Sequence, residues 1–298
     1  MNGPPMEIAV RQLHPHFVGE VADVQLGRPL AAPALRAIAA AIDRYAVLVF
    51  RDQDLDDERQ MAFAANFGEI ETPRSGAAAV KRRLRLELSD ISNLDEKGRL
   101  RAAGDPRRFD QLGNRLWHTD GSFRRVPAAL SMLYAHRVPK EGGETEFADL
   151  RAAWEALPER MRRLVEPLVA IHDIAHSRGQ LGFTELIFDE RQKLPPVPQR
   201  LVRRHPGSGR KTLYLASHAS HIDGWPVPDG RLLLRELIEF ATAREFVYRH
   251  AWRPRDLVIW DNRCTMHRGR PFDESEVRDL RRVTTRDRAS SLEEPAAD

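Results

Sequence analysis

A chain of 298 residues is long enough for one large domain or two small ones. Its 47 basic and 44 acidic residues are interleaved without an RNA-binding or Cys/His-finger motif, which favours a solvated surface over a nucleic-acid interface. No apolar run reaches the roughly 20 residues of a membrane span, no secretory signal is visible, and one cysteine, Cys264, rules out an internal disulfide. We therefore expect a cytoplasmic globular protein without nucleic-acid or membrane partners.

Hydrophobic periodicity predicts the helices and strands in chain order. Helices are expected at 33–45, from Asp56 or Asp57 to Gly68, at 149–165 and at 229–243. A buried strand is expected at 47–50, and later strands at 86–92, 130–134, 168–176, 201–204, 212–215, 245–252, 257–260 and 280–284. The turn Gly207-Ser208-Gly209 predicts a hairpin.

Many short strands separated by turns predict a mainly β protein with flanking helices, built as a sandwich or barrel. We expect a single domain over residues 7–288, with disordered tails at 1–6 and 289–298 because these segments are small, polar and proline-bearing. The stretches 71–84 with 95–114, and 177–200, are long for structureless loops and are typical of active-site lids.

The segment Trp117-His118-Thr119-Asp120 contains the candidate metal ligands. In a strand, residues i and i+2 face the same side, so His118 and Asp120 could converge on one ion. A second His-x-Asp pair, His221 and Asp223, lies in a segment with turn character and is the weaker candidate. Two histidines and one carboxylate form the facial triad of non-haem Fe(II) oxygenases, which leaves positions for a 2-oxo acid and O2.

His267 is the candidate third ligand, although it lies 149 residues after His118. Arg278 follows it by eleven residues, a distance that suits a strand, a turn and the next strand. Arg278 and Arg282 share one face of the predicted C-terminal strand. Two arginines on one face are expected where a cavity receives two anions; the alternative is a solvated edge strand.

Longer segments of the chain resemble the TauD/TfdA group of Fe(II)/2-oxoglutarate dioxygenases, in particular the (2,4-dichlorophenoxy)acetate dioxygenase branch. The resembling segments are A-V-L-V-F-R-D-Q (46–53), F-A-A-N-F-G (63–68), L-W-H-T-D-G-S-F (116–123), G-G-E-T-E-F-A-D-L-R (142–151), R-E-F-V-Y-R-H-A-W (244–252) and D-L-V-I-W-D-N-R-C-T-M-H-R-G-R (256–270). They extend over the whole predicted domain.

This resemblance implies a double-stranded β-helix (jelly-roll, cupin-like) core and a role for each matching residue. Iron ligands would be His118, Asp120 and His267, and the 2-oxoglutarate ligands would be Thr145 and Arg278. Substrate contacts would be Arg282, for the acid group, with Ser122, His218 and His221. The resemblance also implies a homo-oligomer, a dimer or a tetramer.

The implied reaction is hydroxylation of a small carboxylate, an aryloxyacetate of the 2,4-D type, which yields a phenol, glyoxylate, succinate and CO2. Gly121 departs from the pattern, because the herbicide-degrading branch has serine there, and the missing hydroxyl is expected to alter substrate placement. A taurine-like sulfonate or another organic acid is an alternative substrate. A β-barrel binding protein without turnover is the alternative of another class.

Overall fold

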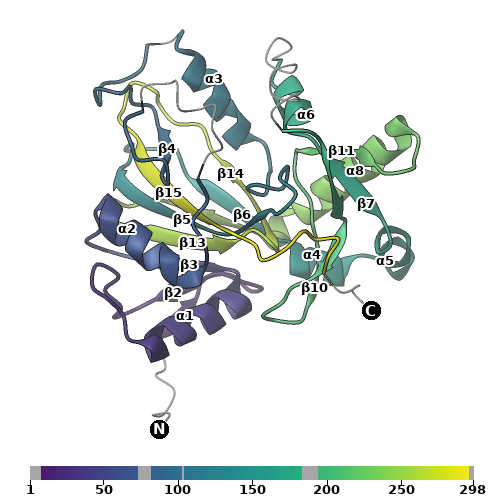
Figure 1. Cartoon of the computed structure of the whole chain (residues 1–298), viewed down its shortest axis with the longest axis horizontal. Coiled ribbons are helices and arrows are strands. Elements are labelled where there is room, and N and C mark those ends of the chain that lie inside the picture. The colour runs from purple at the N-terminus through teal and green to yellow at the C-terminus, as the bar shows by residue number, and fades with distance from the viewer. Residues whose placement is uncertain (1–7, 73–81, 103, 183–193, 295–298) are drawn as a thin grey trace.

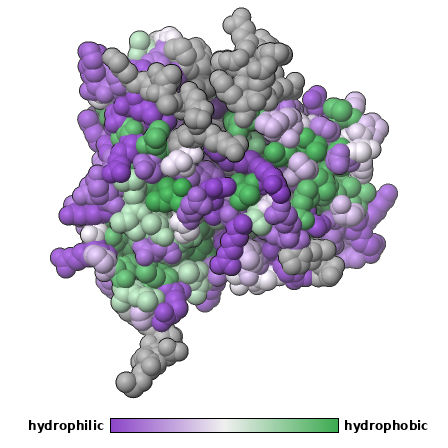
Figure 2. All heavy atoms as spheres, viewed as in Figure 1, coloured by the Kyte–Doolittle hydropathy of each residue, from purple (hydrophilic) through white to green (hydrophobic). Residues whose placement is uncertain are grey.

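The computed structural model describes residues 8–72, 82–102, 104–182 and 194–294. Two facing β-sheets form its centre, and helices cover the outer face of the larger one (Figure 1). Hydrophilic and hydrophobic residues are interspersed on the face in Figure 2. Among the described residues, no helix has the length and hydrophobicity needed to cross a membrane.

The larger sheet has seven strands, which are antiparallel to their neighbours except for one parallel pair, β2 with β3. In spatial order they are β1 (Val10–Gln12), β2 (Gly19–Val21), β3 (Val47–Phe50), β13 (Leu257–Asp261), β5 (Ala128–Arg137), β15 (Asp279–Arg286) and β4 (Ser89–Ser92). The facing sheet has three antiparallel strands: β12 (Val247–His250), β6 (Thr145–Asp149) and β14 (Thr265–Gly269). Together they form the double-stranded β-helix that the resemblance implied.

Alternation along β3 explains why its sequence is continuously apolar. Val47 and Val49 point between the two sheets, where they pack with Phe147 and Trp260. Leu48 and Phe50 point to the opposite face, which packs against the outer helices. A strand that is buried on both faces has no position for a polar residue.

Helices α1 (Ala32–Tyr45) and α2 (Asp57–Ala64) cover that outer face, and both were predicted. Asp56 caps α2 by accepting a hydrogen bond from the Arg59 amide at 2.8 Å. The other helices of the described residues are α3 (Pro106–Leu112), α4 (Leu150–Ala156), α5 (Glu159–Val165), α6 (Ile174–Gly179) and α8 (Val227–Ala241), with 3-10 turns η1 (Ala65–Phe67), η3 (Gly113–Arg115) and η4 (Arg244–Phe246).

A second group of strands packs beside α8 and forms a separate hydrophobic cluster. It contains the sheet of β11 (Ala219–Ile222), β7 (Val169–His172) and β8 (Val197–Arg200), and the hairpin of β9 (Val202–Arg204) and β10 (Lys211–Leu213). The hairpin confirms the prediction from its Gly-Ser-Gly turn.

One predicted helix is divided and one predicted strand is shortened in the structure. The expected helix at 149–165 is two helices, because Pro158 ends the first and caps the second. The expected strand at 168–176 stops at His172, because the Asp173 side chain accepts from the Ala175 amide and begins α6. Of the expected lid stretches, 95–114 contains α3 and the described part of 177–200 contains the end of α6 and β8, whereas residues 73–81 and 183–193 lie outside the described residues.

Residues 289–294 were expected to belong to a disordered tail, but they pack on the fold. Ser291 is fully buried and its hydroxyl lies 2.5 Å from Gln199 Oε1. Glu294 pairs with the guanidinium of Arg203. Local patterns could not predict these contacts, because their partners lie about 90 residues earlier. Residues 1–6 and 295–298 lie outside the described residues.

Candidate active site

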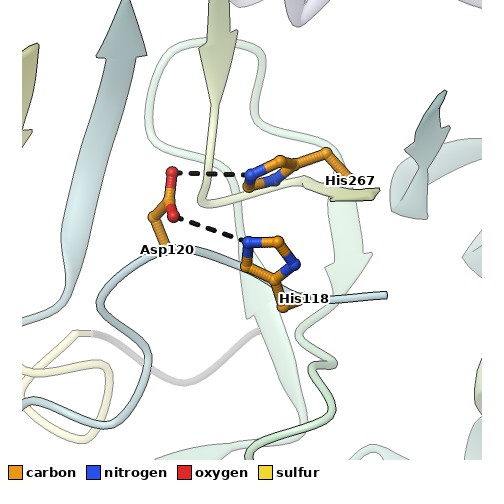
Figure 3. Close-up of side chains that lie close together, drawn as sticks. All are labelled: His118, Asp120 and His267. Carbon is orange, nitrogen blue, oxygen red and sulfur yellow. Dashed lines mark ion pairs between the residues drawn. The ribbon is translucent and has the colours of Figure 1, made fainter. Parts of the chain in front are cut away.

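The structure brings His118, Asp120 and His267 together at one end of the double-stranded β-helix (Figure 3). Their ligand atoms all lie within 4.8 Å of one another, with His118 Nε2 3.8 Å and His267 Nε2 3.6 Å from the Asp120 carboxylate. An isolated antiparallel bridge joins the two histidines: each backbone amide donates to the other carbonyl, at 3.0 and 2.8 Å. This bridge closes the gap of 149 residues between them.

Asp120 reaches the site through a turn, so the strand alternation used to pair it with His118 does not apply. Only His118 lies in a bridge, and the chain turns at residues 120–123, directly after the buried Thr119. The Thr119 hydroxyl contacts the carbonyls of Leu215 and Thr265 at 2.9 and 3.0 Å. This anchored turn, and not the i, i+2 spacing, aims the carboxylate at the histidines.

Two side chains bind the Asp120 carboxylate and two more support them, in roles that sequence reasoning missed or assigned elsewhere. Ser131 donates to Oδ2 at 2.7 Å, and Arg282 donates to Oδ1 at 2.6 Å. Asn262 donates to the Ser131 hydroxyl and accepts from the Asp120 amide and Trp260 Nε1. Because both carboxylate oxygens accept hydrogen bonds, the Asp120 side chain is held in one orientation relative to the histidines.

The three candidate ligands have the protonation states that a divalent cation needs. Burial lowers the pKa of His118 and lowers that of His267 well below its ordinary value, so both imidazoles are neutral. Burial alone raises the pKa of Asp120, but the charge of the Arg282 guanidinium and the hydrogen bond from Ser131 oppose this, and the pKa lies well below its usual range. Two neutral imidazoles and one carboxylate fit the donor set of a non-haem Fe(II) site.

A cavity beside the triad ends at Arg278. Its lining includes His118, His267, Thr145, Leu133 and Arg278. The Arg278 guanidinium donates to the carbonyls of Ile91 at 3.1 Å and Gly143 at 3.3 Å, and no carboxylate of the described residues lies within 4 Å. Burial lowers the pKa of Arg278 to about 10, which is a cost that an anionic ligand would offset.

Thr145 lies on β6 in the same cavity. Its hydroxyl accepts a hydrogen bond from Trp252 Nε1 at 3.0 Å, which leaves the hydroxyl proton available to a ligand. The cavity beside the triad is therefore lined by a cation, the Arg278 guanidinium, and by a hydroxyl donor, Thr145.

A second cavity adjoins the first, and both are lined by His118 and Arg282. Its other lining side chains include Phe123 and His218, whose ring centroids lie 4.9 Å apart. Nδ1 of His218 pairs with the Ser177 hydroxyl at 2.8 Å. Arg282 thus lines both cavities: the first, which also contains Arg278, and the second, which has the aromatic rings of Phe123 and His218.

Two of the predicted substrate residues lie elsewhere. Ser122 is fully buried, its carbonyl accepts from Gln199 Nε2, and it lines neither of these cavities. His221 lies on β11, where its Nδ1 pairs with the adjacent Ser220 hydroxyl, and it also lines neither. The pair His221 and Asp223 is not joined by a third ligand among the described residues.

A second cluster, of His205, Asp261 and Cys264, is already satisfied internally. His205 Nε2 lies 2.9 Å from Asp261, and its Nδ1 accepts from the Ser208 amide. Asp261 is also paired with Arg263 at 2.5 Å. The carboxylate and the imidazole are therefore committed to structural contacts.

Comparisons with known proteins identify the family of this chain. The family model described as "Taurine catabolism dioxygenase TauD, TfdA family" matches residues 9–284. The chain belongs to the TauD/TfdA family. Within it, the chain is 46% identical to the alpha-ketoglutarate-dependent 2,4-dichlorophenoxyacetate dioxygenase of Burkholderia sp. (strain RASC), over 96% of this chain and 97% of that one.

A further relative and a solved structure extend the comparison. The (S)-phenoxypropionate/alpha-ketoglutarate-dioxygenase of Sphingobium herbicidovorans is 38% identical, over 81% of this chain and 82% of that one. The crystal structure of AAD-2 in complex with Mn(II) and N-oxalylglycine superposes with a TM-score of 0.92 at 50% identity, covering 96% of this chain and all of that one.

Membership of the TauD/TfdA family confirms the predicted fold, the enzyme class and the cofactors Fe(II), 2-oxoglutarate and O2. It also favours the enzyme over the alternative of a binding protein without turnover.

Proposed function

We propose that this enzyme hydroxylates an aryloxyacetate at the carbon between the ether oxygen and the carboxylate. The product is a hemiacetal, which breaks down to a phenol and glyoxylate while 2-oxoglutarate and O2 become succinate and CO2. The similarity to 2,4-dichlorophenoxyacetate dioxygenases supports this substrate class. The structural observation that carries the proposal is the cavity that joins the triad to the buried guanidinium of Arg278.

In this proposal His118, Asp120 and His267 hold Fe(II), and the iron supplies the oxidation by O2. Arg278 binds the far carboxylate of 2-oxoglutarate, because a buried fork without a carboxylate partner suits bidentate pairing. Thr145 donates its hydroxyl proton to the same carboxylate. The AAD-2 complex contains a metal and N-oxalylglycine, in which NH replaces a CH2 of 2-oxoglutarate, and this supports the assignment.

Arg282 binds the acid group of the substrate. One of its nitrogens, Nη1, is committed to Asp120, but its Nε has no hydrogen-bond partner among the described residues. The guanidinium can therefore hold Asp120 with one edge and a substrate carboxylate with another. The aryl ring then lies in the second cavity, against Phe123 and His218. Ser122 and His221 have no direct place in this arrangement.

The buried thiol of Cys264, the single cysteine, supports a cytoplasmic location, where thiols stay reduced. A homo-oligomer, dimer or tetramer, stays a prediction from the family resemblance.

The test compares 2,4-dichlorophenoxyacetate with taurine, using Fe(II), 2-oxoglutarate and purified enzyme. We expect phenol and succinate in equal amounts from the first substrate, with kcat/KM at least about tenfold above that for taurine. The variant His267→Ala is the control and should form neither product. Preference for the sulfonate, or succinate formed without phenol, contradicts the proposal and favours the alternative substrate class.

A further inference from the structure

Glu71 and Arg124 form a polar pair in the wall of the second cavity. Both side chains are mostly buried, with exposed fractions of 15% and 26%. Their closest atoms, Glu71 Oε2 and Arg124 Nε, lie 3.9 Å apart, which is an ion pair but too long for a hydrogen bond. Among the described residues, neither Glu71 Oε1 nor Arg124 Nε has a hydrogen-bond partner.

Gly121 explains why the Glu71 oxygen is left without a partner. The residue has φ +64°, and a Cβ built on it would lie 3.5 Å from Glu71 Oε1. The same Cβ would lie 3.0 Å from the Ala128 amide nitrogen, so a side chain at position 121 would be crowded but not excluded. Gly121 also accepts the amide hydrogen of Arg124 in its turn, so the backbone there holds Arg124 beside the glutamate.

The backbone also fixes the pair relative to Arg282. The Glu71 amide donates to the Thr284 carbonyl at 2.8 Å, and Thr284 follows Arg282 by two residues on β15. Two residues of strand span about 7 Å, and residues two apart share a face. That separation is comparable to the reach of a ring substituent from the acid group of an aryloxyacetate.

Buried polar atoms without partners are costly, and a ligand group that satisfies both of them gains affinity. A hydroxyl can donate to Glu71 Oε1 and accept from Arg124 Nε–H, whereas a chlorine atom has no hydrogen to donate to Glu71. An ammonium group could pair with Glu71 but would oppose Arg124. A hydroxyl is therefore the group that fits both atoms.

Building on the proposed function, we propose that this enzyme is specific for aryloxyacetates whose ring bears a hydroxyl group, recognised by Glu71 and Arg124. The acid group binds Arg282, the ring lies against Phe123 and His218, and the hydroxyl lies in the Gly121 turn. Glu71 is then a specificity residue of the substrate cavity.

The test measures binding of 3- and 4-hydroxyphenoxyacetate and of their methyl ethers to the enzyme loaded with Mn(II) and 2-oxoglutarate. The methyl ether removes the hydroxyl proton and leaves the ether oxygen in place. We expect at least one hydroxy acid to bind about tenfold or more tightly than its ether, as for a hydrogen bond to a charged group. In Glu71→Leu the ratio of the two Kd values should fall to about twofold or less.

Glu87→Leu and Gly121→Ala serve as matched controls for Glu71→Leu and Gly121→Ser. Glu87 lines the same cavity but its carboxylate faces Arg85, so Glu87→Leu should keep the wild-type ratio. Gly121→Ser should lower the ratio, because its hydroxyl can donate to Glu71 Oε1, whereas Gly121→Ala adds the same carbon without a donor and should lower it less.

A wild-type ratio near one, or a ratio that survives Glu71→Leu, overturns the inference. Turnover with Fe(II) separates this failure from that of the proposed function. If phenoxyacetate is oxidised but the ratio is near one, only the hydroxyl specificity fails. If no aryloxyacetate is oxidised, the proposed function fails, and the Kd ratio still decides whether Glu71 recognises a hydroxyl.

Discussion

Arg282 donates from Nη1 to Asp120 Oδ1 at 2.6 Å, so the proposed substrate anchor also supports a proposed iron ligand. One guanidinium therefore connects the substrate cavity to the metal site. Removing the Arg282 guanidinium should therefore affect both substrate binding in the cavity and iron binding at the metal site.

Replacing Arg282 with methionine keeps much of the side-chain length and removes the charge. Loss of one partner of a buried charge pair costs about 2–5 kcal/mol, so KM for the acid substrate should rise roughly 30-fold or more. Oxygen uptake measures this change. The neighbouring Arg281 pairs with Asp57 and Asp279 on the other face of β15, so Arg281→Met should change KM little. Equal effects of the two substitutions would argue against the anchor.

Arg278→Met should separate cosubstrate binding from stability. The wild-type guanidinium is buried without a carboxylate, so its removal should leave the unliganded protein at least as stable. KM for 2-oxoglutarate should rise by roughly 30-fold or more. Thermal unfolding with Mn(II) tests both points: 2-oxoglutarate should raise the Tm of the wild type and not that of the variant. An equal rise in both proteins refutes the assignment.

The Thr145 hydroxyl is predicted to make a smaller contribution. Thr145→Val removes the donor and keeps the shape, at a cost of about 1 kcal/mol, or roughly fivefold in KM for 2-oxoglutarate. Thr145→Ser keeps the hydroxyl that accepts from Trp252 and should stay near the wild-type value. If serine and valine behave alike, the hydroxyl has no role in binding.

His172 predicts how stability depends on pH. It is fully buried, stacks on Tyr214 at 5.7 Å, and neither ring nitrogen has a partner among the described residues. Burial lowers the pKa of His172 to about 3, so the folded protein keeps it neutral while the unfolded chain takes up a proton below about 6.5. The free energy of unfolding is therefore highest above pH 6.5 as far as His172 is concerned, and it falls as the pH falls from 6.5 toward 3.

Urea unfolding at pH 7 and pH 5 measures this effect. His172→Phe keeps an aromatic ring against Tyr214 without a titrating group, so it should lose about 2 kcal/mol less than the wild type between the two pH values. Equal losses would show that His172 does not titrate on unfolding.

Local patterns were sufficient for much of the fold and for part of the site. A continuous apolar run identified β3, and apolar spacing with a period of 3.6 identified α1 and α8, because burial on two faces or on one helix face produces these patterns directly. Arg278 and Arg282 could be placed on one strand face for the same reason, and the structure puts both in the cavity beside the triad.

Other parts of the site depend on contacts that no local pattern records. The Asp120 turn is held by Thr119, whose partners Leu215 and Thr265 lie 96 and 146 residues away. The Arg282–Asp120 pair spans 162 residues, and its formation depends on how β15 meets the turn. Ser122 was assigned to the substrate pocket by likeness of motif, but the turn directs it into the interior.

The central claim is that His118, Asp120 and His267 hold one iron ion. Anaerobic titration of the metal-free enzyme with Fe(II), in the presence of 2-oxoglutarate, tests it most directly when the wild type is compared with His267→Ala. We predict one tightly bound ion per wild-type chain and no stoichiometric binding in the variant. One ion per chain with unchanged affinity in His267→Ala would contradict the account.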